Sequence, residues 1–126
     1  MPIIGIGTDI VEIKRFEQLL SRRGEQFKKR IFTNAEIQLG EWRNNLSTFF
    51  AGRWAAKEAC AKALGSGIGG DCSFTDIEIL NDNNGRPKLQ LSGAGKKTFS
   101  RIGGKYIHIS ISHERSYAVA TVIISK

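Results

Sequence analysis

Cysteine is scarce and long apolar runs are missing, and each shortage excludes a class of protein. Cys60 and Cys72 match no metal-binding spacing, and two buried free thiols in a reducing cytoplasm are expected rather than a disulfide. No apolar run approaches the length of about 18 residues that a membrane span needs. The N-terminus leads straight into a predicted strand, without the basic and apolar regions of a signal peptide. The sequence therefore predicts a cytoplasmic protein with no membrane partner.

Internal repeats, linkers and low-complexity segments are also missing. The 126 residues leave little room for a second core, so we predict one domain over residues 1–126. A hydrophobic fraction of 40% and a charged fraction of 25% are those of a folded globular chain. The formal net charge of +7 implies an anionic partner but does not identify it.

Periodicity predicts a mixture of strands and helices. The predicted strands cover residues 3–11, 76–80, 88–91, 106–112 and 117–125. The predicted helices cover residues 12–21, 34–42, 49–64 and 96–101. The helix over 49–64 is rich in alanine and meets Gly65, which is typical of a left-handed cap. Four glycines over residues 65–70 then indicate a loop that approaches a ligand or another backbone.

Three charged residues are the first candidates for a site. Asp9 lies between apolar residues, where a carboxylate is costly unless it is paired or bound to a cation, although it could also cap a helix. Glu58 and Lys62 lie four residues apart and share a helix face. They form either a solvated ion pair or a pair that holds a metal ion and a phosphate. Asp9 and Glu58 together would suit Mg²⁺, which takes one or two protein carboxylates and completes its shell with water and phosphate.

Positive charge is concentrated in residues 14–30. In the predicted helix over 12–21, an apolar stripe leaves Lys14 and Arg15 facing outward. Such a face is either simply solvated or binds an anionic partner. Nucleic acid is one candidate, but no recognised binding motif accompanies the charge.

The predicted strand over 106–112 alternates between apolar and polar side chains. Ile107, Ile109 and Ile111 point one way, and His108 lies on the opposite, polar face. That face meets either solvent or a subunit interface lined for a polar ligand, so His108 is a candidate binding residue. His113 ends the strand, where it could bind a ligand or only cap backbone groups.

Three segments in order along the chain carry a resemblance to one family. They are GIGTDIVEI at 5–13, FAGRWAAKEACAKALG at 50–65, and HISISH at 108–113 followed by YAVA at 117–120. Together they resemble the holo-[acyl-carrier-protein] synthases over essentially the whole chain. One departure is Trp54, where phenylalanine is more usual, and we expect it to alter packing rather than chemistry.

The resemblance implies both a fold and a reaction. The family fold is α+β, with helices packed on an antiparallel sheet, and its short members form homotrimers with active sites between subunits. These enzymes transfer 4′-phosphopantetheine from coenzyme A to a serine of apo acyl carrier protein, in the service of fatty acid biosynthesis. The second product is adenosine 3′,5′-bisphosphate.

The resemblance also assigns roles to residues of this chain. Asp9 and Glu58 would hold Mg²⁺, and Lys62 would neutralise charge on the transferred phosphoryl group. The proton acceptor for the serine is left open between Glu58 and a Mg²⁺-bound water. The implied contacts to coenzyme A are Arg53, Lys62, Gly65 and His108, with Arg53 and His108 coming from a neighbouring subunit.

Lys14 and Arg15 would dock the acidic carrier protein. A basic module that binds nucleic acid is the alternative, but it leaves Asp9, Glu58 and Lys62 unexplained. Another Mg²⁺-dependent phosphotransferase would share the metal without the preference for coenzyme A.

Overall fold

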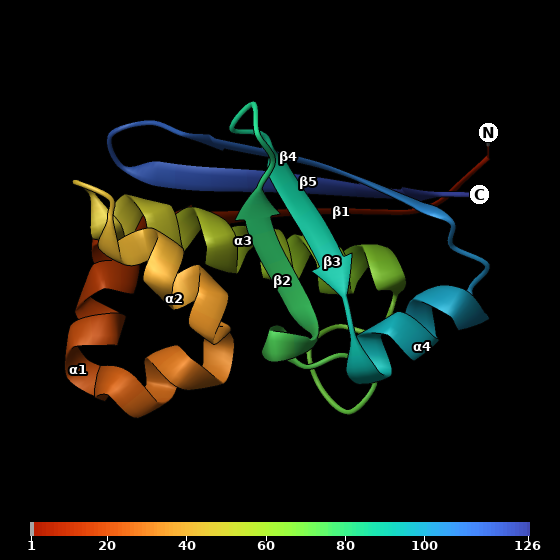
Figure 1. Ribbon diagram of the computed structural model, residues 1–126, viewed down its shortest axis with the longest axis horizontal. Helices are drawn as coiled ribbons and strands as arrows, with labels where there is room; N and C mark the ends of the chain where they lie inside the picture. The colour runs from red at the N-terminus through yellow and green to blue at the C-terminus, as the bar shows by residue number, and fades with distance from the viewer. Residues whose placement is uncertain (1) are drawn as a thin grey trace.

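The computed structural model describes residues 2–126 and has the predicted α+β architecture (Figure 1). The first half of the described chain contains one strand and three helices. These are β1 (Ile3–Glu12), α1 (Ile13–Ile31), α2 (Asn34–Glu41) and α3 (Leu46–Leu64). A short 3₁₀ turn (Phe74–Asp76) leads into the second half. Its elements are β2 (Ile77–Asn81), β3 (Pro87–Leu91), α4 (Gly93–Arg101), β4 (Tyr106–His113) and β5 (Tyr117–Ser125).

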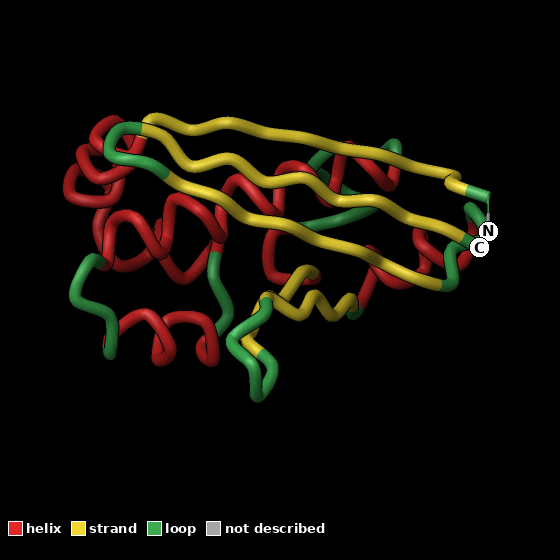
Figure 2. The backbone as a smooth tube through the Cα atoms, turned by 90° about the horizontal axis from the view of Figure 1, so that it is seen from above, coloured by secondary structure: helices red, strands yellow, loops and turns green. Residues whose placement is uncertain are grey.

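A three-stranded antiparallel sheet in the order β1-β5-β4 forms one layer of the molecule. The helix α3 runs beneath its long strands, with α1 and α2 at one end and α4 at the other (Figures 1 and 2). The separate β2-β3 hairpin crosses in front of α3 in the view of Figure 1, and β3 packs against the edge strand β4. The edge strands of the main sheet are β1 and β4.

Small residues allow β1 to lie almost directly on α3. Gly5 and Gly7 face the buried residues Ala59 and Ala63 of the helix. A Cβ on either glycine would lie well inside 3.0 Å of a helix carbonyl oxygen, so no larger residue fits without movement. The alternation of β1 then points Asp9, two residues beyond Gly7, toward the same helix.

A buried ion pair fixes the other side of α3. The Lys57 ammonium lies 2.7 Å from the Glu36 carboxylate, and both side chains are fully buried. Lys57 also donates to the Phe74 carbonyl at 2.9 Å and to the Ile77 carbonyl. The second Glu36 oxygen accepts the Ile79 N–H at 2.8 Å. These contacts hold α3, α2 and β2 together. Lys57 directly precedes Glu58 on α3, so they also fix the helix next to Glu58.

The predicted elements are confirmed, with differences at their ends. The helix predicted over 12–21 continues to Ile31 beyond a kink at Gly24, where φ is +80°. The helices predicted from 49 and 96 begin earlier, at Leu46 and Gly93. Gly65 has the predicted left-handed backbone, with φ at +81°. Both cysteines are buried and free, as predicted.

Candidate functional site

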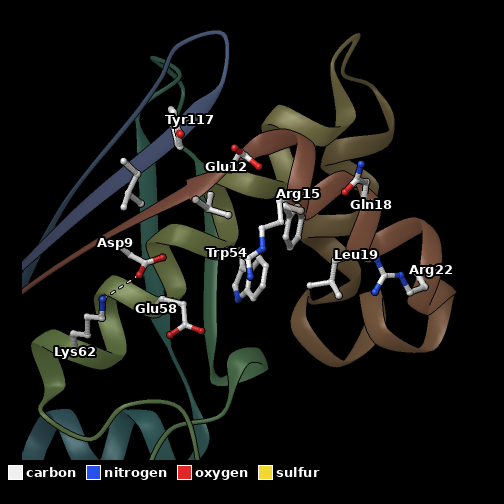
Figure 3. Close-up of a pocket in the computed structure, with 13 residues that line it drawn as sticks. Asp9, Glu12, Arg15, Gln18, Leu19, Arg22, Trp54, Glu58, Lys62 and Tyr117 are labelled. Atoms are coloured by element: carbon white, nitrogen blue, oxygen red, sulfur yellow. Dashed lines mark hydrogen bonds and ion pairs between the residues drawn. The ribbon is translucent and has the colours of Figure 1, made fainter.

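A cavity of about 1000 Å³ opens where β1, α1 and α3 meet (Figure 3). Its polar lining brings together residues that lie far apart in the sequence. The lining includes Asp9, Arg15, Trp54, Glu58 and Lys62. Tyr117 of β5 completes the wall next to β1.

Asp9 and Lys62 form an ion pair across this cavity. The Lys62 ammonium lies 3.0 Å from an Asp9 carboxylate oxygen and also donates to the Thr8 carbonyl at 3.0 Å (Figure 3). The Asp9 side chain is 23% exposed and that of Lys62 is 52% exposed, so both can reach a ligand in the cavity. The expectation that Asp9 is paired rather than isolated is confirmed. The alternative that it caps a helix is not supported, because it lies in mid-strand.

Glu58 faces the same cavity one helical turn before Lys62 (Figure 3). Partial burial is the largest cause that raises the pKa of its carboxyl, and the nearby Asp9 carboxylate raises it further. Lys62 and the Trp54 indole lower it. Two carboxylates that disfavour each other's charge attract a cation to the space between them.

This pair fits Mg²⁺ by its chemistry. Within residues 2–126, no group of three or more His, Cys, Asp and Glu side chains is placed to hold a metal. Mg²⁺ does not need such a group, because it binds through one or two carboxylates and keeps waters and substrate phosphates. The open cavity leaves room for those additional ligands.

A second cavity of about 360 Å³ lies at the other edge of the sheet. Arg53 dominates it: its guanidinium is almost fully buried, donates to Asn81 Oδ1 at 2.9 Å and lies 4.5 Å from the Phe49 ring centroid. Burial lowers the pKa of Arg53 to about 10, and the Glu36 carboxylate opposes the shift. His113 lines the same cavity. A buried guanidinium with donors to spare is a suitable partner for a phosphate.

Comparison with known proteins identifies the family. The family model of the 4′-phosphopantetheinyl transferase superfamily matches residues 5–122. The holo-[acyl-carrier-protein] synthase of Vibrio atlanticus is 46% identical over 124 residues, which cover 98% of each chain. The chain belongs to the holo-[acyl-carrier-protein] synthases. It is therefore an enzyme, a phosphopantetheinyl transferase.

Solved structures agree with this family. The Neisseria meningitidis holo-[acyl-carrier-protein] synthase has a TM-score of 0.92 at 38% identity, covering 99% of this chain and 100% of that one. The Helicobacter pylori relative, in complex with coenzyme A, has a TM-score of 0.84 at 37% identity, with 95% and 99% covered. The Bacillus anthracis relative, in complex with coenzyme A (3′,5′-ADP), has a TM-score of 0.81 at 41% identity, with 97% and 96% covered.

The predicted site residues of this holo-[acyl-carrier-protein] synthase fall into separate places. Asp9, Glu58, Lys62 and Arg15 line the first cavity. Arg53 lies in the second cavity, away from them. His108 is exposed on the outer face of β4, with its ring nitrogen 3.4 Å from Ser125 Oγ, and lines neither cavity.

Two further predicted residues lie outside the cavity linings. Gly65 caps α3, and Lys14 is exposed on α1. No helix in the described part of this holo-[acyl-carrier-protein] synthase is long and apolar enough to cross a membrane.

Sequence reasoning gave Trp54 and His113 too little weight. Trp54 lies one turn before Glu58 on α3, and this spacing of four residues was a usable signal that both face the first cavity. His113 ends β4 and meets Arg53 only through the tertiary structure, so no local pattern could have placed it.

Proposed function

We propose that this enzyme transfers 4′-phosphopantetheine from coenzyme A to a serine of apo acyl carrier protein and releases adenosine 3′,5′-bisphosphate. The observation that carries the proposal is the meeting of Asp9, Glu58 and Lys62 in one open cavity. Transfer from a pyrophosphate to a serine hydroxyl requires positive charge at the phosphoryl oxygens and an acceptor for the hydroxyl proton, and these three side chains would provide for both.

Three side chains of the first cavity would take part in the transfer. Asp9 and Glu58 would hold Mg²⁺, which when bound supplies charge neutralisation at the pyrophosphate. The Lys62 ammonium leaves Asp9 to bind a phosphoryl oxygen of the transferred group. The serine oxygen forms a bond to the phosphorus on the pantetheine side, and the bond from that phosphorus to the departing nucleotide phosphate breaks. Glu58, whose pKa is raised by burial, would accept the serine proton.

The nucleotide end of coenzyme A would bind in the second cavity of a neighbouring copy. The first cavity lies beside β1 and the second beside β4, which are opposite edges of one sheet. The outer face of β1 exposes Ile6 (66% exposed) and Ile10 (63% exposed), as expected of a surface covered by another subunit. A contact between the β1 edge of one copy and the β4 edge of the next is a head-to-tail contact. Contacts of this kind form a ring when the rotation closes, as in the expected trimer.

The carrier protein would bind over α1. Arg15 lines the first cavity, so a carrier held there presents its serine to Glu58 and Lys62. Lys14 extends the same exposed basic surface. Opposite charge on an acidic carrier would raise the encounter rate more than the final affinity.

An intact mass spectrum of the carrier tests the reaction. The purified protein is incubated with apo acyl carrier protein, coenzyme A and Mg²⁺. We expect the carrier to gain about 340 Da, the mass of one phosphopantetheine, and to gain nothing when EDTA is present. Asp9→Asn and Glu58→Gln should nearly abolish the gain while oligomeric state is unchanged. Full activity in Glu58→Gln would refute the metal assignment.

Mixed oligomers test the shared site. Arg53→Gln and Glu58→Gln subunits, each with strongly reduced transfer, are refolded together from denaturant. If one site uses Glu58 of one subunit and Arg53 of the next, a random trimer mixture regains about a quarter of its sites. Mixing Asp9→Asn with Glu58→Gln is the matched control and regains none, because both residues belong to the same half-site. Equal behaviour of the two mixtures would place the whole site within one subunit.

A further inference from the structure

The Trp54 indole N–H is buried and has no hydrogen-bonding partner within residues 2–126. A buried donor without a partner is costly, so such a group in a native structure calls for an explanation. Trp54 lines the first cavity beside Glu58, so its unpaired donor lies next to the proposed chemistry.

Packing fixes the orientation of the indole. Its ring lies 4.5 Å from the Phe16 ring, centroid to centroid, at an angle of 44°. Phe16 is fully buried and holds this face of the indole in the core. Trp54 thus forms part of the first cavity's wall, on the same side of α3 as Glu58 (Figure 3).

Glu58 is the acceptor within reach of that donor. It lies one turn further along α3, on the same face of the helix. Asp9, the other carboxylate of the pair, is already held by Lys62 at 3.0 Å.

We propose that Trp54 is a positioning residue whose indole N–H donates a hydrogen bond to one oxygen of the Glu58 carboxylate. The second oxygen is then turned toward Asp9 and the open cavity. The contact between the two side chains stands on their packing, whereas its consequence for cation binding rests on the proposed function. The sequence predicts that Trp54 alters packing rather than chemistry. That prediction concerns the ring, whereas the N–H would act in addition on the Glu58 carboxylate.

Nuclear magnetic resonance tests the contact directly. The chain has two tryptophans, so a ¹⁵N–¹H spectrum contains two indole signals, and the 87% exposed Trp42 serves as an internal reference. A Trp42→Phe variant assigns them. We expect Glu58→Ala to move the Trp54 indole proton upfield and speed its exchange with solvent, while the Trp42 signal stays in place. Asp9→Asn, which removes a charge but not the acceptor, should move it much less. A Trp54 signal that does not respond to Glu58→Ala would overturn the proposal.

Removing the N–H without changing the ring tests the consequence. Trp54 is replaced by 3-benzothienylalanine, in which sulfur takes the place of the N–H, and separately by phenylalanine. Binding of Mn²⁺ alone is followed by electron paramagnetic resonance. We expect both variants to bind Mn²⁺ about tenfold more weakly than the wild type, because a lost partner of a ligating carboxylate weakens its metal site.

The outcomes separate this proposal from the proposed function. Wild-type Mn²⁺ affinity in the benzothienylalanine variant would overturn the positioning role of Trp54. If the wild type binds no Mn²⁺ while the Trp54 indole signal still responds to Glu58→Ala, the contact is supported and the metal assignment to Asp9 and Glu58 fails.

Discussion

Gly7→Ala tests whether the close contact between β1 and α3 sets the geometry of the site. A Cβ on Gly7 would lie 2.8 Å from the Ala63 nitrogen and closer still to the Ala59 carbonyl oxygen, and neither backbone atom can rotate away. The strand must therefore retreat from the helix by about 1 Å. Asp9 is two residues further on the same face, so it retreats from Lys62 as well. A misplacement of about 1 Å can cost about 10²-fold in rate, and overpacking costs about 1–3 kcal/mol in the free energy of unfolding.

Two measurements check this prediction. Initial rates come from the mass spectrum of the carrier at fixed coenzyme A, and the free energy of unfolding comes from urea denaturation. Gly70→Ala is the matched control, because a Cβ there meets nothing within 4 Å and the backbone is not left-handed. We expect the control to behave as the wild type. If Gly7→Ala loses stability but keeps the full rate, the contact does not set the position of Asp9 and the reasoning is refuted.

Three other substitutions test the carrier surface, the buried ion pair and the raised pKa of Glu58. Arg15→Glu should raise KM for the carrier and flatten its salt dependence, with KM for coenzyme A little changed; an unchanged carrier KM would remove Arg15 from the docking surface. Lys57→Met should cost about 3–5 kcal/mol in urea unfolding, because the buried Glu36 carboxylate loses its partner. Adding Glu36→Gln should recover part of that loss, and no recovery would contradict the explanation. Because burial and then Asp9 raise the pKa of Glu58 in the folded state, its charge costs stability above that pKa and the cost disappears as pH falls through it. Glu58→Gln should therefore melt at a higher temperature than the wild type at neutral pH by calorimetry, and a lower melting temperature would contradict this sign.

Much of the fold could be predicted because the buried faces repeat locally. The alternation predicted for residues 106–112 appears in β4, where Ile107, Ile109 and Ile111 are half-buried and His108 is exposed. Helix ends were predicted less well. The kink at Gly24 interrupts the apolar stripe of α1, so the pattern stopped there although the chain resumes a helix.

The site was predicted in its residue types but not in its arrangement. The cost of an unpaired carboxylate on a strand correctly indicated that Asp9 has a partner. That its partner is Lys62, 53 positions away, depends on β1 lying against α3 through Gly7. No local pattern carries that information, and the family resemblance implied only that Asp9, Glu58 and Lys62 belong to one site.

The position of Arg53 on α3 connects the helix to the proposed sharing of sites. Arg53 and Glu58 are five positions apart, so their side chains point about 140° apart around the helix axis. One helix therefore presents Glu58 and Lys62 to the cavity at β1, and Arg53 to the cavity at β4. The two groups therefore face different sides of the same copy. If coenzyme A contacts Arg53 as well as Lys62, we expect the two contacts to come from different subunits, which is the arrangement that the mixed-oligomer experiment tests.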